Sequence, residues 1–338
     1  MSDTQTSSGG IVVSGVRRAF GSVLAVRDIS FTAVPGTVTA LIGPNGSGKT
    51  TLMLMLASLL RPDAGTIRIA GHDPLTETAA VRRAVGWMPD VLGSWASLSV
   101  RSTLETTARL YRLDRMTAAA RAAELITLVG LDALADQPTR VLSRGQKQRL
   151  SLARALVHDP KVLLLDEPAS GLDPVARIEL RRLVRRVAGE GKTVLISSHV
   201  LAELDEMADA AVYVENGVTA SAERIAGAQR LARPWRIRSS DPVGLEHALL
   251  SIGVAHPEIT RDRTELIVAV GSESAAAELL RRIVASGVPV SVFAPAVDDL
   301  EHTFLGLSRA GASSAANAAS TDNDTGDDVD DANEGVSL

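Results

Sequence analysis

Two adjacent carboxylates, Asp166 and Glu167, end an aliphatic run in the stretch KVLLLDEP, residues 161–168. Four apolar residues bounded by structure-breaking residues predict a short, fully buried strand. Two like charges at the end of such a strand repel each other unless a cation compensates one of them. The pair therefore indicates a site for a positively charged ligand at this strand end.

A phosphate-binding loop is predicted by GPNGSGKT, residues 43–50, which fits the pattern G-x-x-x-x-G-K-[ST]. It follows the strand TALI and opens the helix TTLMLMLASLL, the context that the motif requires. Glycines let backbone N–H groups surround phosphate oxygens, and the helix N-terminus adds its positive dipole end. The residues expected to contact nucleotide here are Gly43, Asn45, Gly46, Ser47, Gly48, Lys49, Thr50 and Thr51.

Each polar residue of this site has a predicted role with ATP and Mg²⁺, the two expected cofactors. Lys49 reaches the β and γ phosphates, and Thr50 supplies a hydroxyl to Mg²⁺. Asp166 holds the metal, directly or through water, and Glu167 faces the γ phosphate and polarises an attacking water. The metal compensates one of the two carboxylates.

A second phosphate-binding helix N-terminus is indicated by LSRGQKQRLSLARAL, residues 142–156. Ser143 is a good N-cap residue, and a helix N-terminus with a free hydroxyl can hold a phosphate. Further along the chain follow SGLDP, which contains Asp173, and LISSHV, which contains His199.

With these motifs in this order, residues 11–216 resemble the ABC ATPases, the nucleotide-binding subunits of ABC transporters. GPNGSGKT matches the Walker A loop, LSRGQ resembles the LSGGQ signature, VLLLDEP matches Walker B, and SGLDP matches the D-loop. The resemblance implies Glu167 as catalytic base, with His199 on the γ phosphate and Lys49 as a further catalytic residue. Phe20 stands where the family stacks an aromatic ring on adenine, although by itself it would be interpreted as a core residue.

The resemblance also implies a head-to-tail dimer of two copies. The signature of one copy would close over the ATP bound to the P-loop of the other. Ser143 and the backbone of Gly145 would then meet the γ phosphate, and Gln146 and Asp173 would belong to the same composite site.

Two positions depart from the family pattern. Asp90 stands where the family has a glutamine that touches Mg²⁺, and a carboxylate remains a good ligand for a hard ion. Because it adds negative charge beside a triphosphate, we expect an intact but slower, more Mg²⁺-sensitive ATPase. Arg144 replaces a glycine, and its guanidinium either reaches the ribose or a phosphate across the dimer or points into solvent.

The fold class predicted for residues 11–222 is α/β: a P-loop ABC ATPase domain with a mixed core sheet, an antiparallel β subdomain and a helical subdomain. The early strands IVVSGVRRAF, LAVRDISFTAV and GTIRIAG are expected to flank the first core strand. Residues 233–307 follow the order β-α-β-β-α-β, which predicts a small α+β domain of ferredoxin-like type. Residues 1–10 are expected to be a flexible lead-in and 308–338 a disordered acidic tail.

Composition narrows the range of functions that the chain could have. The net charge of −5 gives no reason to expect nucleic-acid binding, the chain has no cysteine, and its longest apolar run is about half a membrane span. We therefore expect a cytoplasmic protein, peripheral on the inner face of the cell membrane, that drives separate transmembrane permease subunits. Trp95 and Leu98 are candidates for the groove that receives the permease.

The combination of MPD and LSRGQ with an α/β extension after residue 216 resembles exporter-type ATPases with separate membrane subunits, whereas importer ATPases more often end in small β-barrels. Ser143 follows Lys49 by 94 positions (143 minus 49) without a heptad stretch, which disfavours the coiled-coil DNA-repair ATPases. A single ATPase unit disfavours the tandem translation factors. A regulatory ATP switch that binds a membrane or soluble partner without transport stays open as the alternative.

Overall fold

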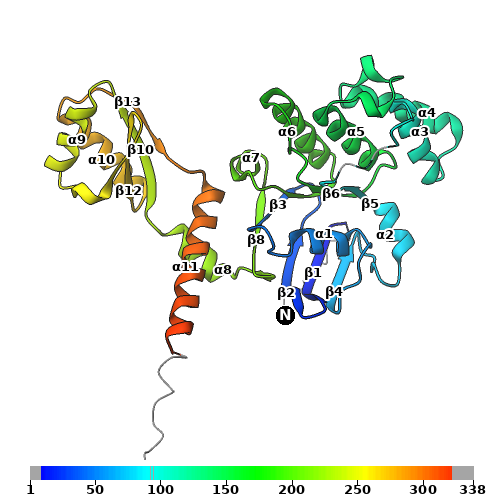
Figure 1. The fold of residues 1–338 in the computed structure, drawn as a ribbon, viewed down its shortest axis with the longest axis horizontal. Helices are drawn as coiled ribbons and strands as arrows, with labels where there is room; N and C mark the ends of the chain where they lie inside the picture. The colour runs from blue at the N-terminus through cyan, green and yellow to red at the C-terminus, as the bar shows by residue number, and fades with distance from the viewer. Residues whose placement is uncertain (1–8, 92, 94, 322–338) are drawn as a thin grey trace, which may run out of the picture. The chain divides into compact units, whose positions relative to one another are not determined.

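The computed structural model describes residues 9–91, 93 and 95–321, which fall into two compact units (Figure 1). The N-terminal unit comprises the described residues up to Ser221 together with Asp298–Glu301. The C-terminal unit comprises Ala222–Val297 and the described chain from His302 onward.

Nine strands of the described chain form one mixed sheet in the N-terminal unit. They are β1 (Ile11–Phe20), β2 (Val23–Ala33), β3 (Val38–Ile42), β4 (Ala64–Ile69), β5 (Val85–Met88), β6 (Val162–Asp166), β7 (Thr193–Ser197), β8 (Ala210–Glu215) and β9 (Val218–Thr219). Their order in the sheet is β4-β1-β2-β9-β8-β3-β7-β6-β5.

The centre of the sheet is parallel and completely buried. Every residue of β3, β6 and β7 is buried, as the apolar runs predicted, because parallel strands covered on both faces need apolar side chains on both. Strand β7 pairs with both β3 and β6, and Asp166 at the end of β6 lies opposite Ser197 at the end of β7. The carboxyl ends of the three strands therefore meet at one edge of the sheet.

The antiparallel strands β1, β2 and β4 precede and follow β3 in the chain as predicted, and they lie together at one end of the sheet. Strand β1 pairs with β2 and β4, and β2 is joined to the rest of the sheet by its pairing with β9, at Asp28 opposite Val218. The neighbours of β3 are β7 and β8. One place beside β3 is taken by a late segment, AAVYVE of β8, which was not recognised as a strand.

The helices of this unit are α1 (Lys49–Leu56), α2 (Thr78–Ala84), α3 (Val100–Leu110), α4 (Arg115–Leu128), α5 (Arg144–Leu156), α6 (Pro174–Gly189) and α7 (Leu201–Asp205). Four of them begin at a side chain that accepts a hydrogen bond from the first turn: Ser99, Asp114, Ser143 and Asp173. Such caps satisfy backbone N–H groups that have no partner inside the helix. Helices α3 and α4 pack on each other and on α5, which packs against β5 (Figure 1).

Acidification is expected to destabilise this unit through His158, which follows α5. Its ring stacks on Tyr111, with centroids 3.7 Å apart, and Nε2 donates a hydrogen bond to the carbonyl of Val85 over 3.0 Å when the ring is neutral. Burial lowers the pKa of His158 from 6.5 to about 4. The folded state therefore favours the neutral ring, and the stability that this ring contributes above about pH 6.5 is lost as the pH falls towards 4.

A His158→Phe variant keeps the stacked ring but cannot take up a proton. The difference in unfolding temperature between wild type and variant should therefore shift in favour of the variant between about pH 7 and about pH 4.5. Thermal unfolding at several pH values measures it, and a difference that stays constant with pH would contradict a buried neutral imidazole.

The C-terminal unit contains a four-stranded antiparallel sheet. Its elements are α8 (Ala222–Gln229), β10 (Arg233–Ser239), α9 (Pro242–Ser251), β11 (Ile259–Asp262), β12 (Glu265–Val270), α10 (Glu273–Ala285), β13 (Val290–Pro295) and α11 (Asp299–Thr321). The strand order is β11-β12-β10-β13. Ile237, Leu249 and Ile283, from the central strand and the two helices, form the centre of its core.

The end of the C-terminal unit differs from the expectation. A disordered tail was predicted from residue 308, whereas helix α11 continues to Thr321. The reason is the alanine content of this stretch, since alanine has the highest helix propensity. The rest of the predicted tail, 322–338, and residues 1–8 of the predicted lead-in lie outside the described residues.

Candidate nucleotide-binding site

A cavity of about 340 Å³ opens at the carboxyl edge of the sheet. The residues that line it are Ala25, Asn45, Gly46, Gly48, Lys49, Thr50, Thr51, Asp90, Asp166 and Glu167. The structure thus brings most of the predicted P-loop together with the two carboxylates of β6 and with Asp90, although these segments are up to 122 positions apart (167 minus 45).

In the P-loop, Gly48 and Gly43 must be glycine for different reasons. Gly48 has φ 100°, and a Cβ there would lie 2.5 Å from the carbonyl oxygen of Ala25. Gly43 has an ordinary φ, but a Cβ would lie 2.2 Å from the carbonyl oxygen of Val214. Since Gly48 precedes α1 and has no side chain to cap it, the N–H groups of the first turn remain available to an anion.

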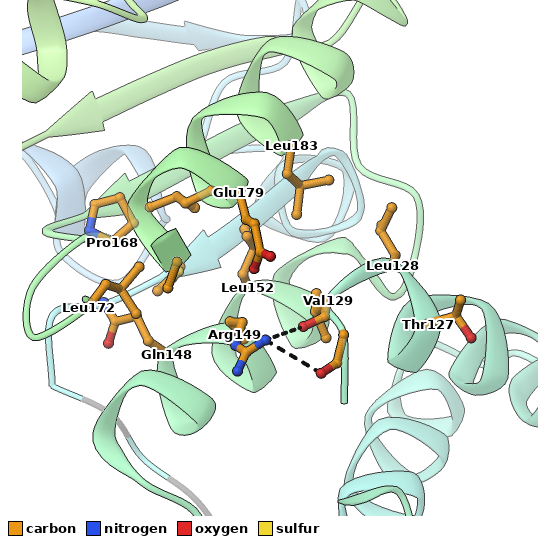
Figure 2. Close-up of a pocket in the computed structure, with 14 residues that line it drawn as sticks. Thr127, Leu128, Val129, Gln148, Arg149, Leu152, Pro168, Leu172, Glu179 and Leu183 are labelled. Carbon is orange, nitrogen blue, oxygen red and sulfur yellow. Dashed lines mark hydrogen bonds between the residues drawn. The ribbon is translucent and has the colours of Figure 1, made fainter. Parts of the chain in front are cut away.

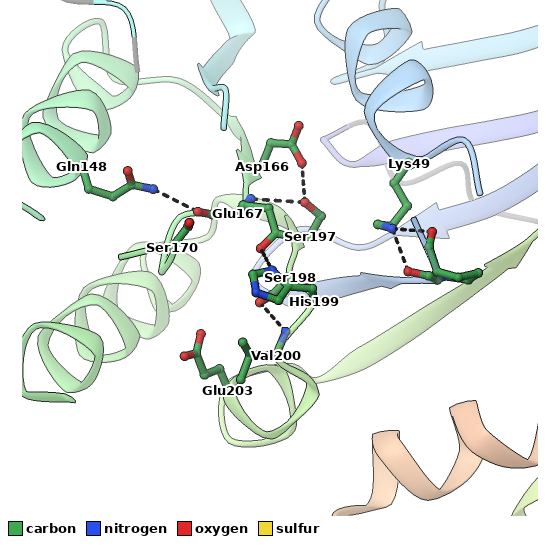
Figure 3. Close-up of polar contacts among 12 residues, drawn as sticks. Lys49, Gln148, Asp166, Glu167, Ser170, Ser197, Ser198, His199, Val200 and Glu203 are labelled. Atoms are coloured by element: carbon green, nitrogen blue, oxygen red, sulfur yellow. Dashed lines mark hydrogen bonds and ion pairs between the residues drawn. The ribbon is translucent and has the colours of Figure 1, made fainter. Parts of the chain in front are cut away.

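Lys49 lies folded over the loop (Figure 3). Its Nζ donates hydrogen bonds to the carbonyl oxygens of Gly43, at 2.7 Å, and Pro44, at 3.0 Å. Burial lowers the pKa of Lys49, and the charges of Glu167 and Asp166 act in the opposite direction. The cavity therefore holds one cation whose hydrogen bonds can be exchanged for bonds to phosphate.

Asp166 is buried, and its Oδ1 accepts a 2.5 Å hydrogen bond from the hydroxyl of Ser197. Burial raises the pKa of Asp166, and the charges of Glu167 and Asp90 raise it further against the effects of Ser197 and Lys49. A cation bound in the cavity would relieve this cost. The site is thus chemically suited to a divalent metal ion.

The donor set also fits the coordination preferences of Mg²⁺. Within the described residues no three carboxylate or imidazole side chains converge to form a complete metal site. Mg²⁺ usually takes one or two protein ligands and completes its shell with water and substrate phosphates. Asp166 and the hydroxyl of Thr50, both at the same cavity, are sufficient for that arrangement.

Glu167 is held from three sides. Its N–H donates to the carbonyl oxygen of Ser197 at 3.1 Å, its carbonyl oxygen accepts from Gln148 Nε2 at 2.9 Å, and its Oε2 lies 2.7 Å from Nδ1 of His199 (Figure 3). Its φ of 51° is unusual for a residue other than glycine. Such backbone conformations persist where the surroundings hold them, and they gather at functional sites.

Gln148 also forms part of the wall of a second cavity, of about 400 Å³, between the end of α4, α5 and α6 (Figure 2). The neighbouring Arg149 donates from Nη1 to the carbonyl oxygens of Val129 and Gly130. Gln148 and Ser197 were not predicted from the sequence. Both are buried polar residues, and such residues require hydrogen-bond partners, which the fold supplies.

The remaining predicted residues lie outside the lining of the nucleotide cavity. Ser143 caps α5 and forms a capping box with Gln146, and Gly145 packs towards Leu172, whose side chain would lie 3.3 Å from an added Cβ. Asp173 caps α6 by accepting from the N–H of Ala176 at 2.9 Å. Within one copy, the signature thus contacts the D-loop. Neither segment lines the P-loop cavity of that same copy.

Arg144 is exposed, and its Nη2 donates to the hydroxyl of Ser170 in the D-loop region at 2.9 Å. Phe20 is 48% exposed at the end of β1, and the guanidinium of Arg18 lies 4.9 Å from its ring centroid. Trp95 is exposed beneath the guanidinium of Arg154, while Leu98 is half-buried.

The fold and the site define a P-loop nucleotide-binding protein of α/β class. Residues 26–170 match the family model described as "ABC transporter". The N-terminal unit of this chain belongs to the ABC transporter family, which confirms the resemblance inferred from its motifs.

Two curated relatives illustrate the similarity. "Daunorubicin resistance ATP-binding protein DrrA3" of Streptomyces coeruleorubidus is 40% identical over 207 residues, which are 61% of this chain and 66% of the relative. "Nod factor export ATP-binding protein I" of Burkholderia lata is 39% identical over 202 residues, which are 60% and 66% of the two chains. This chain therefore spans just under two thirds of these relatives' own length.

A solved structure described as the ATP binding subunit of an ABC transporter superposes with a TM-score of 0.59 at 26% identity, over 64% of this chain and 91% of that chain. The α/β P-loop fold predicted from the sequence is thereby confirmed for the N-terminal unit.

Proposed function

We propose that this chain binds and hydrolyses ATP as a subunit of an ABC exporter, and that it drives separate transmembrane permease subunits. The observation that carries the proposal is the convergence of Lys49, Asp166 and Glu167 at one cavity, with His199 in contact with Glu167. The names of the two relatives, which concern drug resistance and Nod factor export, support export over import.

Each residue of the cavity has its own proposed role in ATP hydrolysis. The N–H groups at the start of α1 and the ammonium of Lys49 bind the β and γ phosphates. Thr50 and Asp166 would hold Mg²⁺, which would neutralise phosphate charge. Glu167 would take a proton from the attacking water, and His199, which contacts Glu167, would contact the γ phosphate.

Closure would involve a second copy of the chain. Because Ser143, Gly145, Gln146 and Asp173 lie outside the cavity of their own copy, we infer that they complete the site of a partner in a head-to-tail dimer. The exposed ring of Phe20 is available to stack on adenine. ATP binds the closed dimer better than the open one, and this difference drives the conformational change.

The remaining parts of the proposal concern the membrane. Within the described chain, every helix is too short or too polar to cross a bilayer. We propose that the permease is a separate chain and that this protein is peripheral on the cytoplasmic face. Trp95 and Leu98 would border the permease groove. For the C-terminal unit we infer a ferredoxin-like domain, which the element order and the strand order β11-β12-β10-β13 support.

A trapped pull-down tests the function. A tagged Glu167→Gln variant is expected to bind ATP without hydrolysing it, so that the complex with the permease persists. Membranes of the native host are solubilised with ATP, and the proteins that copurify are identified by mass spectrometry. A stoichiometric polytopic membrane protein is the expected result, whereas a soluble partner or the homodimer alone would favour a regulatory ATP switch.

An Asp90→Gln variant is expected to hydrolyse ATP at the wild-type rate or up to several-fold faster. The charge of Asp90 raises the pKa of Asp166, so its removal favours the ionised form of the proposed metal ligand. The Mg²⁺ concentration needed for half-maximal activity should fall. Steady-state rates over a Mg²⁺ titration measure both effects, and a collapse of activity in this variant would show that the carboxylate itself is required.

A further inference from the structure

Arg177, on the first turns of α6, joins two segments that the proposed mechanism uses separately. Its Nε donates to the carbonyl oxygen of Leu172, in the D-loop, at 3.1 Å. Its Nη1 lies 3.0 Å from Oε1 of Glu203 on α7. One guanidinium therefore holds the backbone of the D-loop and the carboxylate of α7 at the same time.

Glu203 links Arg177 to the region of His199 and Glu167. Helix α7 begins at Leu201, two residues after His199, and Figure 3 shows Glu203 on this helix with His199 and Glu167 above it. The Glu203 side chain is only 14% exposed. Burial raises the pKa of Glu203, the charges of Arg177 and His199 oppose this, and that of Glu167 adds to it, so the carboxylate is within electrostatic range of both catalytic residues.

Ion pairs and a cavity lie between α6 and α7. A cavity of about 260 Å³ lies between the two helices, and Arg177, Ile178, Glu203 and Met207 are among its lining residues. Arg181 pairs with Glu206 one helical turn further on. Arg177 and Glu203 therefore form a side-chain path by which a displacement of the D-loop can reach α7.

We propose that Arg177 and Glu203 are positioning residues that couple the D-loop to His199 and Glu167. The inference rests on the proposed ATPase function and the proposed dimer, in which the D-loop of one copy meets the site of the other. A shift of the Leu172 carbonyl on dimer closure would move Arg177, then α7, and then His199. The state of one ATP site would thereby set the geometry of the catalytic pair in the other.

Three variants test the coupling: Arg177→Gln, Glu203→Gln and the double variant. Each single variant should lower kcat for ATP roughly tenfold or more, since small misplacements of catalytic groups are costly, with KM changed less than about twofold and a lower Hill coefficient. The double variant should lose no more than either single one, because the two residues act as a unit. Arg177→Lys should be intermediate, since an ammonium is a single point donor.

Arg181→Gln is the matched control. It removes an ion pair on the same helix, and this ion pair has no contact with the D-loop. It should keep kcat and the Hill coefficient. Unfolding temperatures and equilibrium ATP binding are measured for all variants. If Arg177→Gln and Glu203→Gln match the control while wild type hydrolyses ATP, the coupling is refuted and the proposed ATPase function is unaffected. A wild type that hydrolyses no ATP would overturn the proposed function together with it.

Discussion

Replacing Glu167 by glutamine is expected to lower the ATP turnover number by about 100- to 10,000-fold, the usual contribution of a positioned general base. Glutamine has nearly the same shape, so the backbone bonds to Ser197 and Gln148 and a polar contact with His199 can remain. Only the negative charge and the ability to take up a proton are lost. ATP affinity should stay the same or increase, since one repulsion with the triphosphate disappears.

Single-turnover hydrolysis and equilibrium binding of ATP separate these two effects. Glu179→Gln is the matched control: it makes the same chemical change at the second cavity, away from the nucleotide. It should keep both rate and affinity. A Glu167→Gln variant with more than about a tenth of the wild-type rate would exclude Glu167 as the base and direct attention to His199.

The buried parallel strands and the P-loop were predictable because their signals are local. Strands β3, β6 and β7 are apolar on both faces, and the glycines, Lys49 and Thr50 occur within eight consecutive residues. Adjacent residues and fixed spacing suffice to recognise both. The strand end then places Asp166 at the cavity without further information.

Features that depend on distant pairing were not predictable in the same way. Ser197 became visible as a partner of Asp166 only once β6 and β7 were paired. The position of β8 beside β3 follows from a pairing between segments about 170 residues apart. Arg144 and Ser170 are likewise brought together by the packing of the signature on the D-loop, which neither motif reveals by itself.

Replacing Lys49 by methionine is expected to weaken ATP binding by roughly 100-fold, or about 3 kcal/mol. Hydrogen bonds to charged partners contribute about 1.5–3 kcal/mol each, and Lys49 is proposed to bind two phosphates. The net loss is smaller than the sum, because in the free protein the ammonium already bonds the carbonyl oxygens of Gly43 and Pro44. Those bonds must be broken when phosphate is bound.

Stability should respond in the opposite direction, and this separates a binding role from a structural one. Burial lowers the pKa of Lys49, which means that the folded protein holds this cation at a cost. Methionine keeps the apolar stem and removes the cost, so the unfolding temperature of Lys49→Met without nucleotide should be unchanged or higher, a balance typical of functional residues. Lys161→Met, at the other end of the Walker B strand, should affect neither quantity. Calorimetric titration with ATP and thermal unfolding measure the two quantities, and a variant that binds ATP normally but unfolds earlier would make Lys49 a structural residue of the loop.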